Sequence, residues 1–549
     1  MILMVKTNFK GPVVLAVLDG VGLAPHGPGN AVSLARTPFL HHATKNYLYF
    51  AIEASGTAVG LLPGQMGNSE VGHNTMGCGQ IIQHGIAHIN TAFQDGSIWQ
   101  SPAWHYVIDP LITPIDKNLD VCYNKKLNSN SPPTLHFSGI FSDGGVHSHL
   151  DHLEQMITVA YQQGVRRIRI HAVFDGRDVA PQSAHQFINR FHNFIKTLPD
   201  ADIKIASGGG RMTTTADRYN NDWSMVKRGF DMMVHGIANH SFSSALEAIS
   251  TFRHSDSSIQ DQYLPSFVVV DSNQQPIGKI QPGDSLIYFD FRADRAIEIT
   301  RAFTEDNFTP FSRSDFFPSQ LRFAGLTEYD SDAHLPTHQL IPPIKITHPL
   351  NQFLSERRIS QFAISETAKF GHITYYFNGN SHQPATGEKF QEIPSDSGSF
   401  HLRPWMKTAE ITDAILNQLS NFQFLRLNFP GGDMVGHSAH LQATIIAIEA
   451  IDLALSRLAT KIDELGGCLV ITADHGNAEE LLDSDGLQKT AHTSNLVPFI
   501  LYHQTPQRYL PSSLPHPGLA NLASTIALLL GQTNYPSVWQ PPLIKIAPN

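Results

Sequence analysis

The chain has little cysteine, few charged residues and no general excess of basic ones. Its 549 residues include only Cys78, Cys122 and Cys468, which are too few and too scattered for a disulfide framework or a thiolate metal site. Charged residues make up 16% of the chain and the net charge is −10, so we expect no nucleic-acid partner. The first strongly apolar run, Val13–Leu18, is too short for a signal peptide or a membrane span. We therefore expect a protein of the reducing cytoplasm with no membrane partner.

The chain does contain ample material for buried cores, since hydrophobic residues make up 41% of it. At this length roughly two to four domains are expected. Short apolar runs rich in β-branched residues predict strands that are buried on both faces. Each of these runs ends at polar residues: Val13–Leu18 before Asp19, Phe424–Phe429 before Asp433, and Cys468–Thr472 before Asp474 and His475.

Between the last two runs, apolar residues recur at helical spacing: Ile445, Ile448, Ile451, Leu455 and Leu458. A strand, a helix and a second strand in this order predict a right-handed parallel crossover. The sequence thus predicts an α/β fold with a mainly parallel sheet flanked by helices.

The middle of the chain predicts a second α/β domain. Strands are expected over Arg167–Phe174, Ile203–Ala206 and Ser285–Phe289. Because candidate site residues lie at both ends of the chain, we expect this domain to interrupt the first one. The predicted boundaries are 1–83 plus 343–549 for the outer domain and 84–342 for the inserted domain. The proline-rich and asparagine-rich segment Asp109–Pro133 is predicted to be a surface loop.

Carboxylates and imidazoles at predicted strand ends suggest divalent metal sites. The candidates are Asp19, Asp433, His437, Asp474, His475 and His492, together with Ser69 in the glycine-bounded run Met66–His73. Taken singly, each is more commonly part of a turn, a helix cap or a surface histidine. Taken jointly, they resemble a two-metal phosphatase site, in which an ion lowers the pKa of the serine and both ions stabilise the phosphoryl oxygens.

Arginines follow the predicted strands of the middle domain and could bind an anion through forked hydrogen bonds. They are Arg177, Arg211, Arg218, Arg292 and Arg295. Arg292 and Arg295 are three residues apart and are expected to share one face of a short helix. A predicted glycine-rich turn over Gly208–Arg211 would let backbone N–H groups approach the same anion. Arginines near loops are also commonly solvated, so each alone is a weak signal.

With these motifs in order along nearly the whole chain, the sequence resembles the cofactor-independent (2,3-bisphosphoglycerate-independent) phosphoglycerate mutases of the alkaline phosphatase superfamily. The resemblance is carried by short motifs around Asp19, Gly67–His73, Ser142–His149, Asp175–Asp178, Phe291–Arg295, Ser365–Lys369, Asp433–His437, Thr472–Asn477 and Ala491–Thr493. It implies an alkaline-phosphatase-like sheet interrupted by an inserted domain. The segment between Arg211 and Arg218 departs from the usual family pattern.

The resemblance also implies roles for particular residues. One Mn²⁺ would be held by Asp433, His437 and His492, and a second by Asp19, Ser69, Asp474 and His475; Zn²⁺ or Co²⁺ would suit the same ligand types. Ser69 and Lys369 would be catalytic. The substrate would be bound by His147, Arg177, Asp178, Arg211, Arg218, Arg292, Arg295 and Lys369.

The implied reaction interconverts 2-phosphoglycerate and 3-phosphoglycerate through a phosphoserine, in glycolysis and gluconeogenesis, with no requirement for 2,3-bisphosphoglycerate. The expected partner is this small-molecule substrate, and we expect a monomer. Retention of glycerate during the reaction suggests domain closure about residues 83 and 343 as a hypothesis. The alternatives are another phosphomutase or a phosphomonoesterase of the same superfamily, or an inactive binding protein on the same fold.

Overall fold

The computed structural model describes residues 9–112, 132–217, 221–314, 316, 318–330, 333–483 and 485–547. The chain forms two compact units. Unit 1 comprises residues 1–87 and 344–549, and unit 2 comprises residues 88–343. We propose that these units are the two domains expected from the sequence, with divisions at 87/88 and 343/344 in place of 83/84 and 342/343.

Unit 1 is built on a seven-stranded sheet with the strand order β11-β10-β12-β1-β13-β14-β2. The sheet is parallel except for β14, which runs antiparallel to both of its neighbours. Every residue of β1, β12 and β13 is buried, as expected for strands covered on both faces. The strands are β1 Val13–Leu18, β2 Leu48–Ile52, β10 Gln361–Glu366, β11 Glu388–Ile393, β12 Phe424–Phe429, β13 Cys468–Thr472 and β14 Val497–His503.

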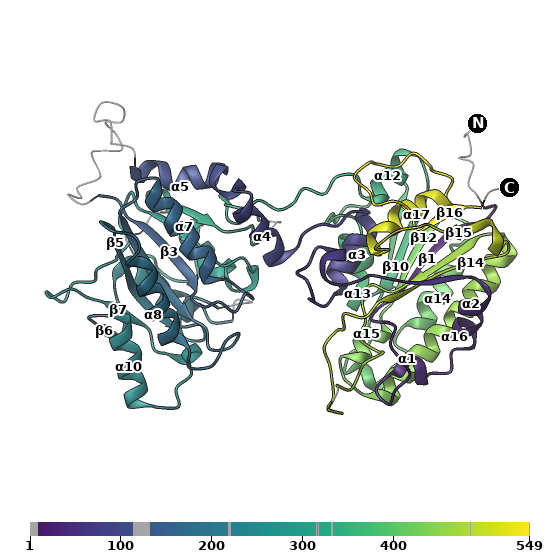
Figure 1. The fold of residues 1–549 in the computed structure, drawn as a ribbon, viewed down its shortest axis with the longest axis horizontal. Coiled ribbons are helices and arrows are strands. Elements are labelled where there is room, and N and C mark those ends of the chain that lie inside the picture. Colours follow the sequence, from purple (N-terminus) through teal and green to yellow (C-terminus); the bar gives the residue numbers. More distant parts are fainter. Residues whose placement is uncertain are drawn as a thin grey trace. The chain divides into compact units, whose positions relative to one another are not determined.

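Helices cover both faces of this sheet (Figure 1). One layer packs α14 and α16 on the strands and α1 and α2 against α16; the other contains α3, α12, α13 and α17. The helices are α1 Ala31–Leu34, α2 Pro38–Asn46, α3 Ser69–Cys78, α12 Leu350–Glu356, α13 Thr367–Gly371, α14 Thr408–Leu416, α15 Gly431–Gly436, α16 Leu441–Leu465 and α17 Leu522–Leu529. A small sheet pairs β15 Tyr509–Pro511 with β16 Ile544–Ile546.

The predicted crossover is confirmed. Helix α16 lies between β12 and β13 in the chain, and Ile448, Ile451, Leu455 and Leu458 are buried in the core of unit 1. Because β12 and β13 both pair in parallel with β1, their carboxyl ends meet at the same edge of the sheet.

Unit 2 is built on its own seven-stranded sheet with the order β6-β7-β5-β4-β3-β8-β9. Strands β5, β4, β3, β8 and β9 are parallel, whereas β7 pairs antiparallel with β5. The strands are β3 Leu135–Ile140, β4 Arg167–Phe174, β5 Asp202–Gly210, β6 His240–Phe242, β7 Phe267–Val269, β8 Ser285–Tyr288 and β9 Arg322–Gly325.

Two apolar clusters flank the sheet of unit 2. The larger one joins the sheet to α4, α5, α7, α8 and α10, and the smaller one joins it to α9 and α11. The helices are α4 Gly85–Gln94, which begins at the end of unit 1, α5 Pro102–Ile112, α7 Leu150–Gln162, α8 Ala184–Ile195, α9 Trp223–Phe230, α10 Ala245–Ser255 and α11 Ile297–Thr304.

Two local predictions for unit 2 differ from the structure, the first of them at one end only. Of the predicted loop Asp109–Pro133, Asp109–Ile112 instead completes α5, with Pro110 inside the helix. Residues 113–131, including Cys122, lie outside the described residues, so the loop stays a prediction there. Of the predicted glycine-rich turn Gly208–Arg211, Gly208–Gly210 is instead the end of strand β5. The Gly210 N–H donates to Leu264 O, so this group serves the fold rather than an anion.

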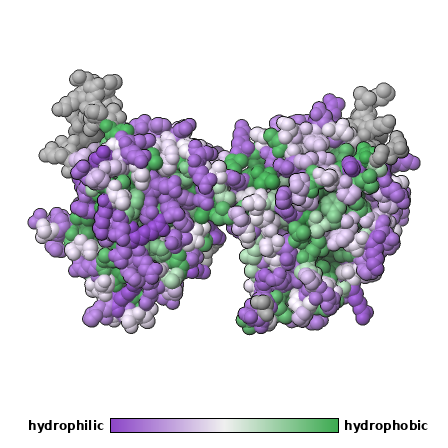
Figure 2. Space-filling model, in the orientation of Figure 1, coloured by the Kyte–Doolittle hydropathy of each residue, from purple (hydrophilic) through white to green (hydrophobic). Residues whose placement is uncertain are grey.

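Large apolar side chains at the surface are scattered, for example Leu402, Leu453 and Leu487. Figure 2 shows hydrophobic residues interspersed with hydrophilic ones on the visible face of each unit. Within the described ranges, no helix has both the length and the apolar composition needed to cross a membrane.

Candidate active site

Four parallel strands of unit 1 deliver the candidate residues to one edge of the sheet. Asp19 directly follows β1, Asp474 and His475 follow β13, and Asp433 lies in α15 directly after β12. Lys369 lies in α13, directly after β10. Since the carboxyl ends of parallel strands are where α/β sheets place their sites, the fold itself brings these residues together.

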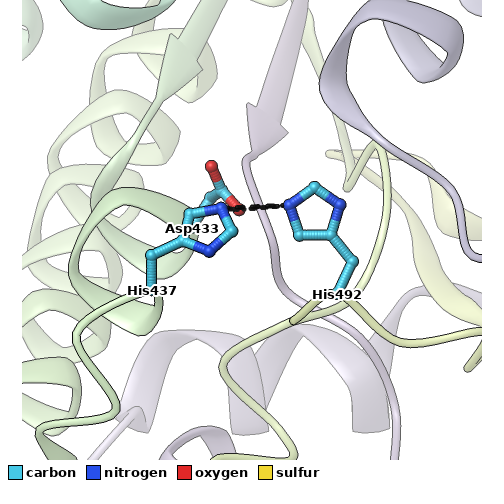
Figure 3. Close-up of side chains that lie close together, drawn as sticks. All are labelled: Asp433, His437 and His492. Carbon is cyan, nitrogen blue, oxygen red and sulfur yellow. Dashed lines mark hydrogen bonds and ion pairs between the residues drawn. The ribbon is translucent and has the colours of Figure 1, made fainter. Parts of the chain in front are cut away.

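Asp433, His437 and His492 form the first cluster, shown in Figure 3. The Nε2 atoms of His437 and His492 each lie 3.2 Å from Asp433 Oδ1, and 3.1 Å from one another. The Nδ1 atom of His437 lies 2.7 Å from Thr490 O, and that of His492 lies 2.9 Å from Gly67 O. A carbonyl can only accept, so each Nδ1 carries the proton and each Nε2 of the neutral ring presents a lone pair. Two lone pairs and a carboxylate oxygen that converge in this way are the donor set of a divalent cation.

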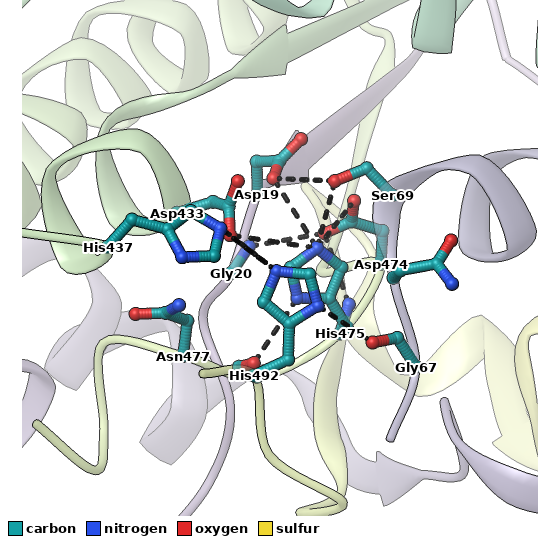
Figure 4. A network of polar contacts seen from close by, with 12 residues as sticks. Asp19, Gly20, Gly67, Ser69, Asp433, His437, Asp474, His475, Asn477 and His492 are labelled. Carbon is teal, nitrogen blue, oxygen red and sulfur yellow. Dashed lines mark hydrogen bonds and ion pairs between the residues drawn. The ribbon is translucent and has the colours of Figure 1, made fainter. Parts of the chain in front are cut away.

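The second cluster surrounds Asp19, beside the first (Figure 4). The Nε2 atom of His475 lies 3.7 Å from Asp19 Oδ1, 3.5 Å from Asp474 Oδ2 and 3.9 Å from Asp433 Oδ1. Asp19, Asp474 and His475 are all completely buried. Burial and the neighbouring Asp474 raise the pKa of Asp19, as expected for carboxylates crowded together out of water.

Ser69 lies at the first position of α3, where Asn68 caps the helix by accepting from the Val71 N–H. Its Oγ lies 3.3 Å from Asp19 Oδ1 and 2.9 Å from His475 Nε2. A helix N-terminus favours negative charge, so this position suits a serine that is to carry a phosphoryl group.

Lys369 joins the nucleophile candidate to both clusters. Its Nζ donates to Ser69 Oγ at 2.5 Å and to Asp433 Oδ2 at 2.6 Å, and it lies 2.9 Å from Asp19 Oδ1. Burial acts against its charge, but Asp19 and Asp433 outweigh burial and raise the pKa of Lys369. The ammonium group therefore stays charged and favours the deprotonated form of the serine hydroxyl.

The two clusters fit cations. They contain three buried carboxylates, those of Asp19, Asp433 and Asp474. Among the described residues, the lysine or arginine side chain that forms ion pairs with these carboxylates is that of Lys369 alone. Asp433 Oδ1 and Asp474 Oδ2 are buried and accept no hydrogen bond from the described residues. Unpaired charge and unsatisfied oxygens are costly inside a protein, and divalent ions among these oxygens and imidazoles would offset both costs.

Two residues beside Ser69 were not assigned a role from the sequence. His73, one helical turn after Ser69, is buried, with its Nδ1 2.8 Å from Ser69 O and 3.3 Å from Asp474 Oδ2. Asn428 donates to Asp19 Oδ2 at 2.6 Å and lies 3.0 Å from His73 Nε2. His73 thus presents its Nδ1 to Ser69 O and its Nε2 to the Asn428 amide, which orients the start of α3. Asp19, His73 and Asp474 also lie close enough together to hold an ion. The spacing of His73, four residues after Ser69 on a helix, was the signal that could have found it.

Unit 2 contains a separate cluster around Arg211, which lies directly after β5 and is buried. Its Nη1 lies 2.6 Å from Asp175 Oδ1 and 2.5 Å from Asp178 Oδ2, and its Nη2 lies 2.8 Å from His147 Nε2. Because a guanidinium group only donates, His147 Nε2 accepts and Nδ1 carries the proton, 3.4 Å from Asp294 Oδ1. Burial and the nearby Arg211 lower the pKa of His147 to about 4, so the ring is neutral at pH 7.

The remaining predicted substrate residues of unit 2 are not all gathered in this cluster. Arg177 is exposed, and Arg292 is exposed with its Nε 3.5 Å from Asp294 Oδ1. Arg295 is buried and donates to Ala216 O. The prediction that Arg292 and Arg295 share one face is therefore wrong, since one side chain is exposed and the other is buried. Arg218 lies outside the described residues.

Asp175 and Asp294 are the members of the cluster that the sequence analysis left without a role. Asp175 anchors the loop after β4, since it accepts from Ser142 Oγ at 2.7 Å and from the Asp178 N–H at 3.1 Å. Its place directly after a predicted strand was a usable signal.

Comparison with known proteins first gives the class. A model of the Metalloenzyme superfamily matches residues 11–534, in agreement with the metal-site geometry of unit 1. The crystal structure of a Leishmania mexicana phosphoglycerate mutase at low cobalt concentration is 37% identical, covers 99% of both chains and has a TM-score of 0.67. The predicted α/β fold class, with mainly parallel sheets flanked by helices, is confirmed.

The curated relatives then give the family. A probable 2,3-bisphosphoglycerate-independent phosphoglycerate mutase of Leptospira interrogans is 42% identical over 562 residues, with 98% of each chain covered. The 2,3-bisphosphoglycerate-independent phosphoglycerate mutase of Trypanosoma brucei brucei is 39% identical, covering 99% of this chain and 98% of its own. The chain belongs to the family of 2,3-bisphosphoglycerate-independent phosphoglycerate mutases, and the predicted resemblance is confirmed.

Proposed function

We propose that the chain interconverts 2-phosphoglycerate and 3-phosphoglycerate through a phosphoserine on Ser69, with divalent metal ions in the two clusters of unit 1. As a member of its family the chain is an isomerase of glycolysis, independent of 2,3-bisphosphoglycerate. The observation that carries the proposed route is the surrounding of Ser69 Oγ, which lies within 3.3 Å of Lys369, His475 and Asp19.

The proposed metal ligands are Asp433, His437 and His492 for one ion, and Asp19, Ser69, Asp474 and His475 for the other. Mn²⁺ suits this mixture of carboxylates and imidazoles, as do Zn²⁺ and Co²⁺. When bound, the ions supply positive charge beside Ser69 and the transferred group, which favours the ionised hydroxyl and offsets charge on the phosphoryl oxygens.

Ser69 Oγ would attack the phosphorus of bound phosphoglycerate. The bond between phosphorus and the glycerate oxygen breaks, its electron pair stays on that oxygen, and phosphoserine forms. The Lys369 ammonium group, already within hydrogen-bond distance of Ser69 Oγ, would stabilise the ionised hydroxyl before the attack and offset charge on the phosphoryl oxygens during the transfer. The first glycerate oxygen would take up a proton and the other hydroxyl would release one. The oxygen of this second hydroxyl would then attack the phosphoserine, and the broken bond would leave its electron pair on Ser69 Oγ.

The residues of unit 2 are proposed to bind the substrate. Arg211 and Asp178, with neutral His147 beside them, present donors and acceptors suited to a carboxylate and hydroxyl groups. Arg177, Arg292 and Arg295, and Arg218 outside the described residues, are proposed to add positive charge. Holding glycerate while phosphoserine persists would make the enzyme a mutase rather than a phosphatase.

The remaining proposals concern the state of the protein. We propose that it is a monomer in the cytoplasm, with the small-molecule substrate as its partner. The low cysteine content and the negative net charge support this setting.

The test is a coupled assay that starts from 3-phosphoglycerate without bisphosphoglycerate. The enzyme is first treated with a chelator and then dialysed, and Mn²⁺ is returned to half of it. We expect activity to be lost and then restored by Mn²⁺. Activity that survives complete metal removal would contradict the proposal, and release of inorganic phosphate in place of 2-phosphoglycerate would favour a phosphomonoesterase.

A further inference from the structure

Glu479 is a buried carboxylate that forms no hydrogen bond with Ser69 or with the side chain of a proposed metal ligand. It does accept hydrogen bonds from the loops that carry several of those ligands. It is 2% exposed and follows His475 by four residues. Its Oε2 accepts from the backbone N–H groups of Gly22 and Asn477, both at 2.9 Å. Its Oε1 accepts from Thr493 Oγ and, at 3.0 Å, from Asn495 Nδ2.

These four donors come from three separate loops. Gly22 belongs to the loop that begins with Asp19, Asn477 to the loop that begins with Asp474 and His475, and Thr493 directly follows His492. The loops are also joined by backbone hydrogen bonds, from the Thr493 N–H to Gly476 O at 3.0 Å and from the Ala478 N–H to Gly20 O at 2.9 Å. Glu479 therefore occupies the point where the ligand loops of both metal clusters meet.

The carboxylate of Glu479 fills space that two neighbouring glycines leave open. A Cβ at Gly22 would lie 2.3 Å from Glu479 Oε1, and a Cβ at Gly476 would lie 2.2 Å from the same oxygen. Real Cβ atoms essentially never make contacts this short, so a side chain at either glycine would displace the carboxylate. All four partners donate, which suits a carboxylate because its two oxygens only accept.

We propose that Glu479 is a positioning residue that sets the metal affinity of both clusters by fixing the three ligand loops in one arrangement. The inference rests on the proposed metal ligands. It follows from the connections of His492, whose Nδ1 is held by Gly67 O while its neighbour Thr493 is held by Glu479. Loss of the carboxylate removes the hydrogen bond that holds Thr493, the neighbour of His492. It also removes those that hold Gly22 in the Asp19 loop and Asn477 in the His475 loop.

The experiment is a titration of the metal-free full-length protein with Co²⁺, followed by visible absorption and by calorimetry. In Glu479→Gln an amide NH₂ replaces one oxygen and faces N–H or O–H donors. We expect both ions to bind more weakly, by up to about 10–100-fold, which is the loss when groups hydrogen-bonded directly to metal ligands are removed. The Co²⁺ absorption bands should change in shape, since the ligand geometry changes. With Mn²⁺ kept limiting, kcat should fall while KM for phosphoglycerate stays unchanged, and saturating Mn²⁺ should restore kcat.

Glu480→Gln is the matched control. Glu480 pairs with Lys489 at 2.6 Å and shares Asn495 with Glu479, but it is half-exposed, and the Gly22 and Asn477 N–H groups donate to Glu479 rather than to its carboxylate. Its backbone N–H donates to Asn477 O at 3.1 Å, a bond that a change of side chain leaves in place. We expect its Co²⁺ affinity and spectrum to equal those of the wild type. If Glu479→Gln does not fold, Thr493→Val decides the matter, because it removes one donor beside His492 and should weaken one of the two binding events.

Folded Glu479→Gln with wild-type affinity and an unchanged Co²⁺ spectrum would overturn the proposal, as would unchanged affinity in Thr493→Val. A fall in thermal stability alone, without a change in affinity, would also overturn it. A wild-type protein that binds fewer than two ions would instead contradict the proposed ligands, so the two failures can be told apart.

Discussion

Lys369→Met is the substitution whose consequences the structure defines most sharply. The ammonium group of Lys369 lies within 3 Å of Ser69 Oγ, Asp433 Oδ2 and Asp19 Oδ1, and the side chain is buried. Methionine keeps an unbranched chain and removes the charge. The variant thus leaves two buried carboxylates without their cation and leaves Ser69 without its positively charged donor.

The two losses act on different measurements. Breaking a buried ion pair by removing one partner costs about 3–5 kcal/mol, so the metal-free variant should unfold at a temperature lower by roughly 6–10 °C. Removing one preorganised donor from a developing charge costs about 100–1,000-fold in kcat. The variant clusters also carry one more negative charge, so metal ions should raise the unfolding temperature by more in the variant than in the wild type.

The assay combines thermal unfolding of the metal-free and Mn²⁺-loaded forms with steady-state kinetics at saturating Mn²⁺. Lys461→Met serves as the control, because Lys461 pairs with Glu464 on the exposed side of α16, and neither measurement should change appreciably. A smaller metal-induced rise in Lys369→Met than in the wild type would refute the electrostatic reasoning. A kcat within threefold of the wild type would refute the assignment of Lys369 as catalytic.

Three further predictions concern pH, substrate binding and stability. Contact with Asp433 raises the pKa of His437 and, against the opposite effect of burial, the pKa of His492, so both bind a proton more tightly than ordinary histidines. Because protons compete with the metal, activity at limiting Mn²⁺ should fall from about pH 8 to 6, and excess Mn²⁺ should move the fall to lower pH. A flat pH profile would contradict the assignment of these ligands. Arg211→Lys loses the forked geometry and about 1.5–3 kcal/mol of charged hydrogen bonding, so KM for 3-phosphoglycerate should rise roughly 10–100-fold in steady-state assays, whereas an unchanged KM would remove Arg211 from the substrate site. Arg426→Met leaves buried Glu388 without its cation and should lower the free energy of unfolding, measured with denaturant, by about 3–5 kcal/mol. The loss should be smaller when Glu388→Gln is added, and equal losses in the single and double variants would mean that the two side chains are not coupled.

The sequence was sufficient to predict three of the four strands that carry the site, β1, β12 and β13, and the residues at their ends. Lys369, after β10, was identified only through the family resemblance. Val13–Leu18 and Cys468–Thr472 are continuous apolar runs that stop at aspartates, and in an α/β chain such short runs are typical of buried parallel strands. Parallel pairing then places Asp19 and Asp474 at one edge without further information. Local patterns sufficed because a continuous apolar run and the helix between two such runs are both visible in short stretches of sequence.

The sequence was not sufficient where a role depends on tertiary contacts. Arg295 has the same spacing from Arg292 as two residues on one helical face, yet its guanidinium group turns inward to Ala216 O. The glycines of Gly208–Gly210 predict a turn by composition, but they are the end of a strand. Glu479 carries little local signal, because only Asn477 of its four donors is close to it in the sequence, and the others belong to two further loops.

The central claim is that Ser69 carries the phosphoryl group between the two positions of glycerate. The most direct measurement is mass spectrometry of peptides from the Mn²⁺-loaded enzyme, quenched in acid during turnover of 3-phosphoglycerate, with Ser69→Ala treated in parallel. We expect one phosphoryl group on the peptide that contains Ser69. In Ser69→Ala we expect no phosphopeptide and no turnover, although close to two Mn²⁺ ions per chain still bind. Turnover by Ser69→Ala, or a phosphoryl group on another residue of the working enzyme, would contradict this claim.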